Sequence, residues 1–298
     1  MGHKKSVLLT LAIILSCAGI FAAEPDKPAP QANDPEQQIG DFSLSGYGDK
    51  GKKAWDLSGK SADIVNEVVK LKDVVGNHYA DEDNINLTAD KGRFDKKSGV
   101  VHLEDNVIIT TSSGTKMTTD SLDWDRKQQV VSTLDAINLK RQDMNLSGEG
   151  ARGQTALKQV ALEKNVRLDI ETQDKQESKK EKIVIICDGP LEVDYEKNIA
   201  IFNNNVKVEA PDLTIYSDRM QVYFTPKPAA SSKVEESAVT SSSITKIVSE
   251  GNVRILRGGN TSYSQEAVYT AMDKRIVLTG RPHIEIYQTE KLNAAFRN

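Results

Sequence analysis

Residues 87–110, LTADKGRFDKKSGVVHLEDNVIIT, contain the pattern on which the whole chain is organised. Apolar and polar residues alternate along this stretch, and the alternation is interrupted at residues 96–99 and again at residues 105–106. Alternation with a period of two is typical of half-buried antiparallel strands, whereas Gly, Asn and Asp are typical of the turns between them. The stretch therefore predicts a strand, a turn, a strand, a second turn at residues 105–106, and a third strand.

The same pattern recurs along the chain. An Asn-Val pair followed by alternation occurs four times, at Asn106-Val107, Asn165-Val166, Asn205-Val206 and Asn252-Val253. A second element, an apolar residue followed by small and acidic residues, begins at Leu87, Met117, Leu146, Ile215 and Tyr263. Successive copies in the first half are spaced by roughly thirty residues, which is typical of stacked repeats. Because one repeat cannot bury its own apolar face, neighbouring repeats must cover it.

Residues 61–75 are ambiguous, because their apolar residues also fit one face of a helix. The register of the repeats favours strands here, since Ile64 aligns with Phe94. We therefore predict two strands with Asn66 and Glu67 between them.

Charge and aromatic content argue against a nucleic-acid partner. The formal net charge is -4, and removing residues 1–23, which hold two lysines and no acid, lowers it to -6. Only 5% of the residues are aromatic, so few side chains could stack on bases. An acidic, aromatic-poor chain is a poor partner for nucleic acid.

Residues 1–23 have the features of an export signal. Lys4 and Lys5 precede an apolar run that ends in small residues. This order is that of a secretory leader, with cleavage expected after Ala22 or Ala23. Two other fates fit the same residues: a lipoprotein signal that would place a lipid on Cys17, and an uncleaved, short membrane anchor. Each of the three implies export from the cytoplasm.

After the leader we predict two β modules. In chain order the parts are a flexible tether, a first module, a charged linker, a second module and a C-terminal tail, at residues 24–41, 42–171, 172–182, 183–288 and 289–298. The second module contains an insertion rich in Pro, Ala and Ser at residues 225–243, which we expect to be disordered.

Motifs for catalysis and cofactors have simpler structural explanations. Residues 148–153, GEGARG, match the dinucleotide pattern, but neither a buried strand nor a helix pattern flanks them. The histidines are not at metal-ligand spacing, and the acids fall mostly in turns rather than in a catalytic pair. We therefore expect no enzyme activity, no cofactor and no metal site. Cys187 lies in an apolar run and is expected to be a buried, inert thiol.

The positive feature is an apolar face shared by the repeats. We expect the alternating residues to point to one interior, and the candidates are Phe94, Val101, Leu103, Val107, Ile109, Val166, Leu168, Val206, Val208, Val253 and Ile255. The residue pattern leaves two interpretations open. The face is either a sealed core or an aliphatic groove that holds acyl chains.

Several motifs resemble the lipopolysaccharide-transport bridge family, LptC and LptA, which share an OstA-like domain. Those similar to LptC are WDLSG at Trp55, LTADKG at Leu87 and MTTDSLD at Met117. Those similar to LptA are IVSEGNVRI at Ile247 and YSQEAVY at Tyr263. Each motif is short, but their order and spacing cover nearly all of residues 42–288.

The resemblance implies two tandem twisted antiparallel β-jellyrolls of the OstA-like type, whose interiors shield the acyl chains of lipopolysaccharide without any chemistry. It implies lipopolysaccharide, an inner-membrane export ATPase complex and an outer-membrane translocon as partners. It also implies edge-to-edge contact with other jellyrolls or a second copy of this chain. Gly148 lies near a glycine that matters for coupling in LptC and is the coupling candidate. The presence of both modules in one chain departs from the separate proteins usual in the family.

Two other functions stay open from the residues alone. One is a scaffold or filament protein of the cell envelope, built from β repeats with a dry core and no lipid ligand. The other is an exported carbohydrate-active enzyme on a β-repeat fold, which the lack of a carboxylate pair disfavours.

Overall fold

The computed structural model describes residues 37–48, 51–79, 84–125, 127–141, 143–154, 157, 159–173, 180–225, 244–273 and 275–286. The expected leader and C-terminal tail lie outside these ranges, as do most of the tether, the linker and the insertion. The described residues form seventeen strands, and all strand pairs whose residue partners are given below are antiparallel. The expected all-β antiparallel fold is confirmed. Within the described ranges, no helix has the length and apolarity needed to span a membrane.

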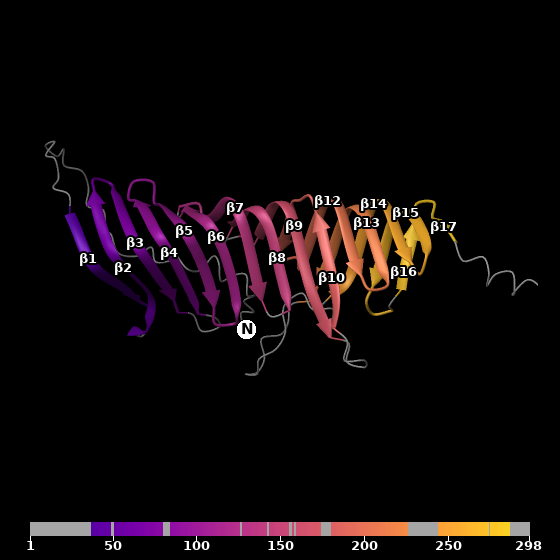
Figure 1. The fold of residues 1–298 in the computed structure, drawn as a ribbon, viewed down its shortest axis with the longest axis horizontal. Coiled ribbons are helices and arrows are strands. Elements are labelled where there is room, and N and C mark those ends of the chain that lie inside the picture. The colour runs from indigo at the N-terminus through magenta and orange to yellow at the C-terminus, as the bar shows by residue number, and fades with distance from the viewer. Residues whose placement is uncertain are drawn as a thin grey trace, which may run out of the picture. The chain divides into compact units, whose positions relative to one another are not determined.

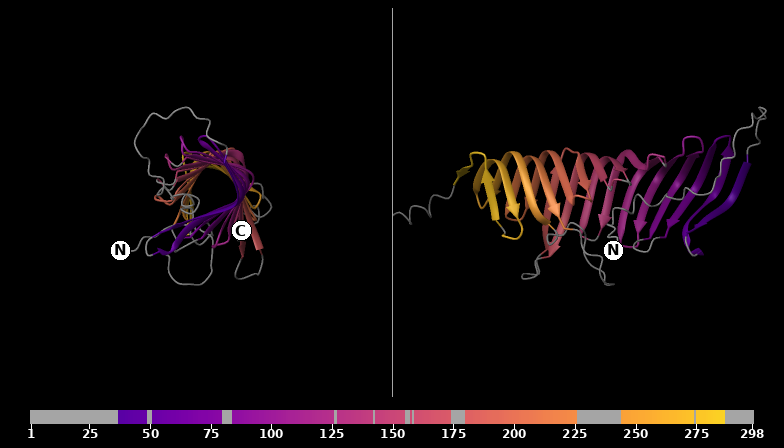
Figure 2. Two further views of the ribbon diagram at one scale, coloured as in Figure 1. Left: turned by 90° about the vertical axis from the view of Figure 1, so that its left-hand side faces the viewer. Right: turned by 180° about the vertical axis from the view of Figure 1, so that it is seen from behind.

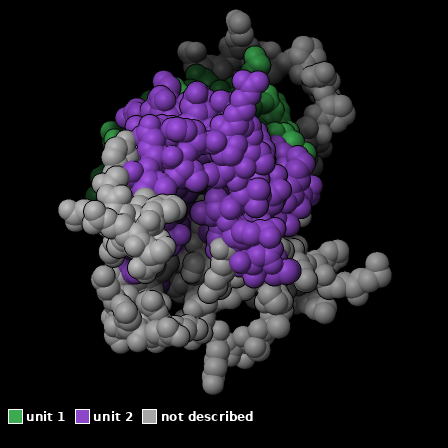
Figure 3. Space-filling model, turned by 90° about the vertical axis from the view of Figure 1, so that its right-hand side faces the viewer, with its two compact units in different colours: residues 1–139, 151–158 green, residues 140–150, 159–298 purple. Residues whose placement is uncertain are grey.

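The chain divides into two compact units, which Figure 3 shows in different colours. Unit 1 consists of residues 1–139 and 151–158, and unit 2 of residues 140–150 and 159–298. The division falls inside two strands, β7 (Val130–Arg141) and β8 (Met144–Gln154).

Unit 1 begins with a meander in which each strand pairs with the next (Figure 1). Its first six strands are β1 (Gln37–Tyr47), β2 (Lys53–Val65), β3 (Val68–His78), β4 (Ile85–Asp95), β5 (Val100–Thr111) and β6 (Thr115–Asp125). The two strands predicted within residues 61–75 are confirmed, since β2 and β3 are joined by a turn at Asn66 and Glu67. The strands are curved along their length rather than flat (Figure 2).

The second turn expected in residues 87–110 was wrong, because β5 runs unbroken through residues 105–106. Asp105 and Asn106 have left-handed backbones, with φ of 62° and 53°. Together they stand opposite the single residue Asp120 of β6, because Glu104 pairs with Ser121 and Val107 with Thr119. This is a β-bulge, which inserts an extra residue and bends the strand without ending it. Asn and Asp are the residues that a turn and a bulge both favour, so composition alone does not separate the two.

Three of the four Asn-Val repeats coincide with such a bulge, because β12 and β14 also shift register directly before Val206 and Val253. The asparagines that correspond to Asn106 have φ values of 52°, 53° and 46°, at Asn165, Asn205 and Asn252. The valines that follow them are at most 1% exposed, at Val107, Val166, Val206 and Val253. The repeat therefore places a left-handed residue on the outer side of the strand and a buried valine directly after it.

Unit 2 continues the antiparallel pattern. Its strands beyond the division are β9 (Gln159–Gln173), β10 (Lys180–Cys187), β11 (Leu191–Asp194), β12 (Ile199–Ala210), β13 (Leu213–Phe224), β14 (Ile244–Arg257), β15 (Asn260–Thr270), β16 (Arg275–Thr279) and β17 (His283–Glu285). Strands β10 and β11 lie end to end between β9 and β12, and pair with both. From β12 to β15 each strand again pairs with the next.

Candidate functional site

The candidate residues of unit 1 lie together in one apolar core. Leu103, Val107 and Ile109 are between 0 and 6% exposed and belong to a single cluster, against which Val101 packs. Phe94 is half-buried and stands in register with Val101 across β4 and β5. The alternating face expected from the sequence is therefore an interior surface of this unit.

The same core contains side chains that the sequence analysis did not single out. They include Val74, Ile85, Met117, Leu122 and Trp124. On β6 the buried positions change phase, because Met117 and Thr119 are buried on one side of Asp120 and Leu122 and Trp124 on the other. One uninterrupted period of two along β6 does not predict this set. Alternation applied separately to the residues before and after Asp120 predicts it.

The candidates of unit 2 also point inward. Five of them are buried, namely Val166, Leu168, Val206, Val253 and Ile255. The sixth, Val208, is half-buried. Leu168, Ile185 and Val208 stand in one cross-strand row on β9, β10 and β12. Val253 and Ile255 pack with Ala267 in a second group. Each unit thus has an aliphatic interior, in which the described side chains contact one another.

A few polar side chains share these interiors. In unit 1 the hydroxyls of Thr119 and Thr133 lie 3.5 Å apart, and the Asp135 backbone N–H donates to Thr133 Oγ1 at 3.1 Å. In unit 2 Ser217 and Ser264 are 5% and 7% exposed. Their hydroxyl oxygens have no hydrogen-bond partner among the described residues.

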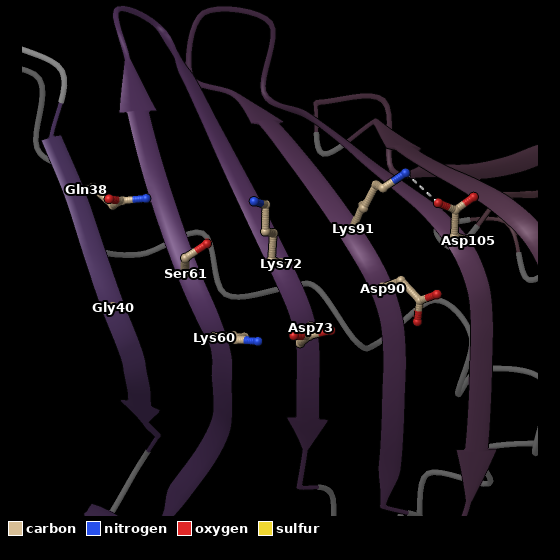
Figure 4. Close-up of a pocket in the computed structure, with 9 residues that line it drawn as sticks. All are labelled: Gln38, Gly40, Lys60, Ser61, Lys72, Asp73, Asp90, Lys91 and Asp105. Atoms are coloured by element: carbon tan, nitrogen blue, oxygen red, sulfur yellow. Dashed lines mark ion pairs between the residues drawn. The ribbon is translucent and has the colours of Figure 1, made fainter.

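A charged groove lies beside the β5 bulge of unit 1, outside the apolar core. Figure 4 shows the residues that line it, which come from β1 to β5 around a volume of about 550 Å³. They are Gln38, Gly40, Lys60, Ser61, Lys72, Asp73, Asp90, Lys91 and Asp105. Lys91 and Asp105 form an ion pair of 2.7 Å across β4 and β5. Because lysines and aspartates both line it, this groove is unsuited to acyl chains.

Two histidines have opposite electrostatic environments. His78 is buried at the end of β3, and burial lowers its pKa below the usual value of 6.5. His102 lies between Asp123, 2.5 Å from its Nδ1, and Glu104, 2.9 Å from its Nε2. Partial burial lowers the pKa of His102, but its hydrogen bonds and charge attraction to the two carboxylates outweigh this and raise the pKa overall.

The remaining motifs have structural roles. Cys187 is 1% exposed and burial raises the pKa of its thiol, so the expectation of a buried cysteine is confirmed. The glycines of GEGARG lie within β8 rather than in a loop before a helix. A Cβ at Gly148 would lie 3.0 Å from Leu162 and 3.1 Å from the Lys164 carbonyl oxygen, so this glycine allows β8 and β9 to approach closely. Among the described residues, no group of three or more His, Cys, Asp or Glu side chains could hold a metal ion.

Comparison with known proteins adds two family matches. The model described as "Lipopolysaccharide-assembly, LptC-related" matches residues 7–171. The model described as "LptA/(LptD N-terminal domain) LPS transport protein" matches residues 190–295. A crystal structure of LptH from Pseudomonas aeruginosa, the LptA-homologous periplasmic component of its lipopolysaccharide transport device, is 12% identical. The similarity covers 68% of this chain and 94% of LptH, with a TM-score of 0.19. No curated protein gave a significant match.

Both matched families are transport families without catalytic activity, which agrees with the expectation that the chain is not an enzyme. Proteins of these families are periplasmic. The LptC-related match covers more than half of the chain. This chain therefore belongs to the LptC-related family of lipopolysaccharide-assembly proteins, and it carries an LptA/LptD N-terminal domain in its second half.

Proposed function

We propose that this protein is a periplasmic component of the bridge that carries lipopolysaccharide from the inner to the outer membrane. The observation that carries the proposal is the tandem arrangement of an LptC-related domain and an LptA-type domain in a single chain. In this proposal residues 42–171 form the first module and residues 183–288 the second. One chain thus combines two consecutive parts of the lipid path.

The acyl chains of lipopolysaccharide would occupy the aliphatic interiors. The support is the placement of the candidate residues, which face the interior of unit 1 from β4 and β5 and that of unit 2 from β9, β12 and β14. Each methylene group of an acyl chain that leaves water for such a surface contributes roughly 0.8 kcal/mol. The interior side chains contact one another, so an incoming lipid must replace those contacts with its own.

The partners follow from this position in the path. They are lipopolysaccharide, the inner-membrane export ATPase complex, the outer-membrane translocon, and jellyroll partners that join at strand edges. Strand β1 supports an edge contact, because it exposes Ile39, Leu44 and Tyr47 at 46%, 55% and 67%. An exposed strand with apolar side chains is suited to strand addition. In this scheme Gly148 contributes to coupling by keeping β8 and β9 close.

Native mass spectrometry of the mature protein from its own periplasm tests the proposal. We expect lipopolysaccharide to co-purify at close to one molecule per chain. The protein mass also separates a cleaved leader, a lipid on Cys17 and a retained anchor. A ligand-free mass that does not change after incubation with lipopolysaccharide would refute the proposal and favour the scaffold function.

Photo-crosslinking locates the lipid. A photoreactive amino acid at Val101 or Val208, which are half-buried interior positions, should crosslink to lipopolysaccharide. Leu134 on β7 is the control, because it is 93% exposed. Equal crosslinking at Leu134 and at the interior positions would contradict an interior lipid path.

A further inference from the structure

Two cross-strand pairs of the same kind lie in the interior of unit 2. Val206 of β12 is in register with Ser217 of β13, and Val253 of β14 with Ser264 of β15. Both valines are 1% exposed, and both serines are more than nine-tenths buried. Each pair therefore sets a buried serine opposite the valine that follows an Asn-Val bulge.

The two serine hydroxyls are polar groups buried in an apolar interior. Their oxygens have no hydrogen-bond partner among the described residues. The nearby interior is apolar, with Ile255 and Ala267 in the same group as Val253. A buried hydroxyl without a partner destabilises a protein, and alanine of nearly the same size would avoid that cost. The hydroxyls are thus suited to donate to a group that the described residues do not provide.

Unit 1 offers an internal comparison. Thr119 stands in register with Val107 as Ser217 does with Val206. The Thr119 hydroxyl lies 3.5 Å from that of Thr133, so the two can pair. At the equivalent position of unit 2, the Ser217 hydroxyl has no partner among the described residues. At this register position the unpaired hydroxyl therefore occurs in unit 2 and not in unit 1.

We propose that Ser217 and Ser264 donate hydrogen bonds to carbonyl oxygens of ester- or amide-linked acyl chains held in the interior of unit 2. A carbonyl group has the acceptor that a serine hydroxyl needs, and the attached methylene groups match the surrounding valines. The serines are two strands apart, or about 10 Å, so they would bind the carbonyls of two different chains. This inference rests on the proposed function and specifies which part of the lipid unit 2 recognises.

A competition between two lipids tests the inference. The full mature chain is incubated with equal amounts of ester-linked phosphatidylglycerol and its ether-linked analogue of the same chain length, and native mass spectrometry measures the retained ratio. The ether lipid lacks the carbonyl acceptors. We expect the ester lipid to be retained about threefold to tenfold better for each hydroxyl bond formed. The double variant Ser217→Ala, Ser264→Ala should retain both lipids equally.

Two further variants control for packing. Ser217→Cys with Ser264→Cys keeps the shape of the side chain, slightly enlarged, but has only a weak donor, and it should also lose the preference for the ester. Ser98→Ala removes an exposed hydroxyl in the turn between β4 and β5, outside both interiors, and should leave the preference unchanged. Equal retention of both lipids by the unchanged protein, or a preference that survives in the double alanine variant, would overturn the inference while leaving interior lipid binding intact. Failure to retain either lipid or lipopolysaccharide would instead overturn the proposed function itself.

Discussion

The side-chain amide of Asn106 donates a hydrogen bond of 2.7 Å to the carboxylate of Asp90 on the neighbouring strand. Asn252 makes the corresponding bond to Asp218 at 2.8 Å. In both cases the asparagine is the left-handed residue of a bulge, and the acid ends the apolar-small-acidic element of the strand beside it. The two sequence elements of the repeat are therefore two halves of one contact.

The first prediction concerns the conformation of Asn106. Asn106→Ala should lower the free energy of unfolding by about 1–2 kcal/mol, because alanine is strained at positive φ and lacks the amide donor. Asn106→Gly should cost less, because glycine adopts this conformation freely and loses only the exposed hydrogen bond. Urea unfolding of both variants measures the difference. If Asn106→Ala and Asn106→Gly were equally destabilising, strain at positive φ would not be the reason for asparagine at this position.

The second prediction compares two glycines of positive φ, Gly251 within β14 and Gly258 in the turn that follows it. A Cβ at Gly251 would lie 2.4 Å from the Asp218 carboxylate, whereas a Cβ at Gly258 meets nothing within 4 Å. Both substitutions to alanine should cost roughly 1–2 kcal/mol for the backbone. Gly251→Ala should cost roughly 0.5–1.5 kcal/mol more, because it displaces the Asp218 carboxylate from Asn252. Urea midpoints that match for the two variants would disprove the Asp218 contact.

The third prediction uses two leucines of unit 1 with opposite exposure. Leu103 is 6% exposed and Leu134 is 93% exposed. Leu103→Glu should destabilise unit 1 by more than about 4 kcal/mol or prevent its folding, because an unpaired charge would be buried. Leu134→Glu should change the free energy of unfolding by no more than about 0.5 kcal/mol. Circular dichroism during thermal unfolding gives both values, and a folded Leu103→Glu variant of unchanged stability would contradict the assigned interior.

The fourth prediction concerns acid sensitivity through His78. Burial lowers its pKa in the folded protein, so the unfolded chain binds a proton more readily. Folding stability should therefore fall as the pH drops below the unfolded value of about 6.5. His78→Leu should remove this part of the loss. The test is the urea midpoint at pH 7.5 and at pH 5.5, and an unchanged difference between the two in the variant would exclude His78 as the cause.

His102 should change folding stability with pH in the opposite direction to His78. Its pKa is raised by Asp123 and Glu104, so its contribution to stability is complete below about pH 6.5. That contribution is lost as the pH rises through the raised pKa. His102→Gln should therefore be more destabilising at pH 5.5 than at pH 8.5, by a modest amount because the site is partly solvated. A variant whose stability deficit is the same at both values would refute the ion pairs.

Much of the fold could be predicted from local pattern, because a period of two shows which residues share a face. The pattern identified strands, the Asn66 turn and buried residues such as Leu103 and Val166. It failed at Asp105 and Asn106, where a bulge has the composition of a turn. It also missed Trp124, because the bulge shifts the alternation on the opposite strand.

The sequence by itself determined that the chain is a β-repeat protein, since alternation and the Asn-Val pairs are local properties of neighbouring residues. Only the tertiary structure decided which strands pair, and so which groups meet. Asp90 and Asn106 are 16 residues apart, whereas Asp218 and Asn252 are 34 apart. Nothing local predicts that both pairs make the same bond. The unpaired hydroxyls of Ser217 and Ser264 likewise follow from the residues around them in space, because hydrogen bonding depends on the partners that folding brings within reach.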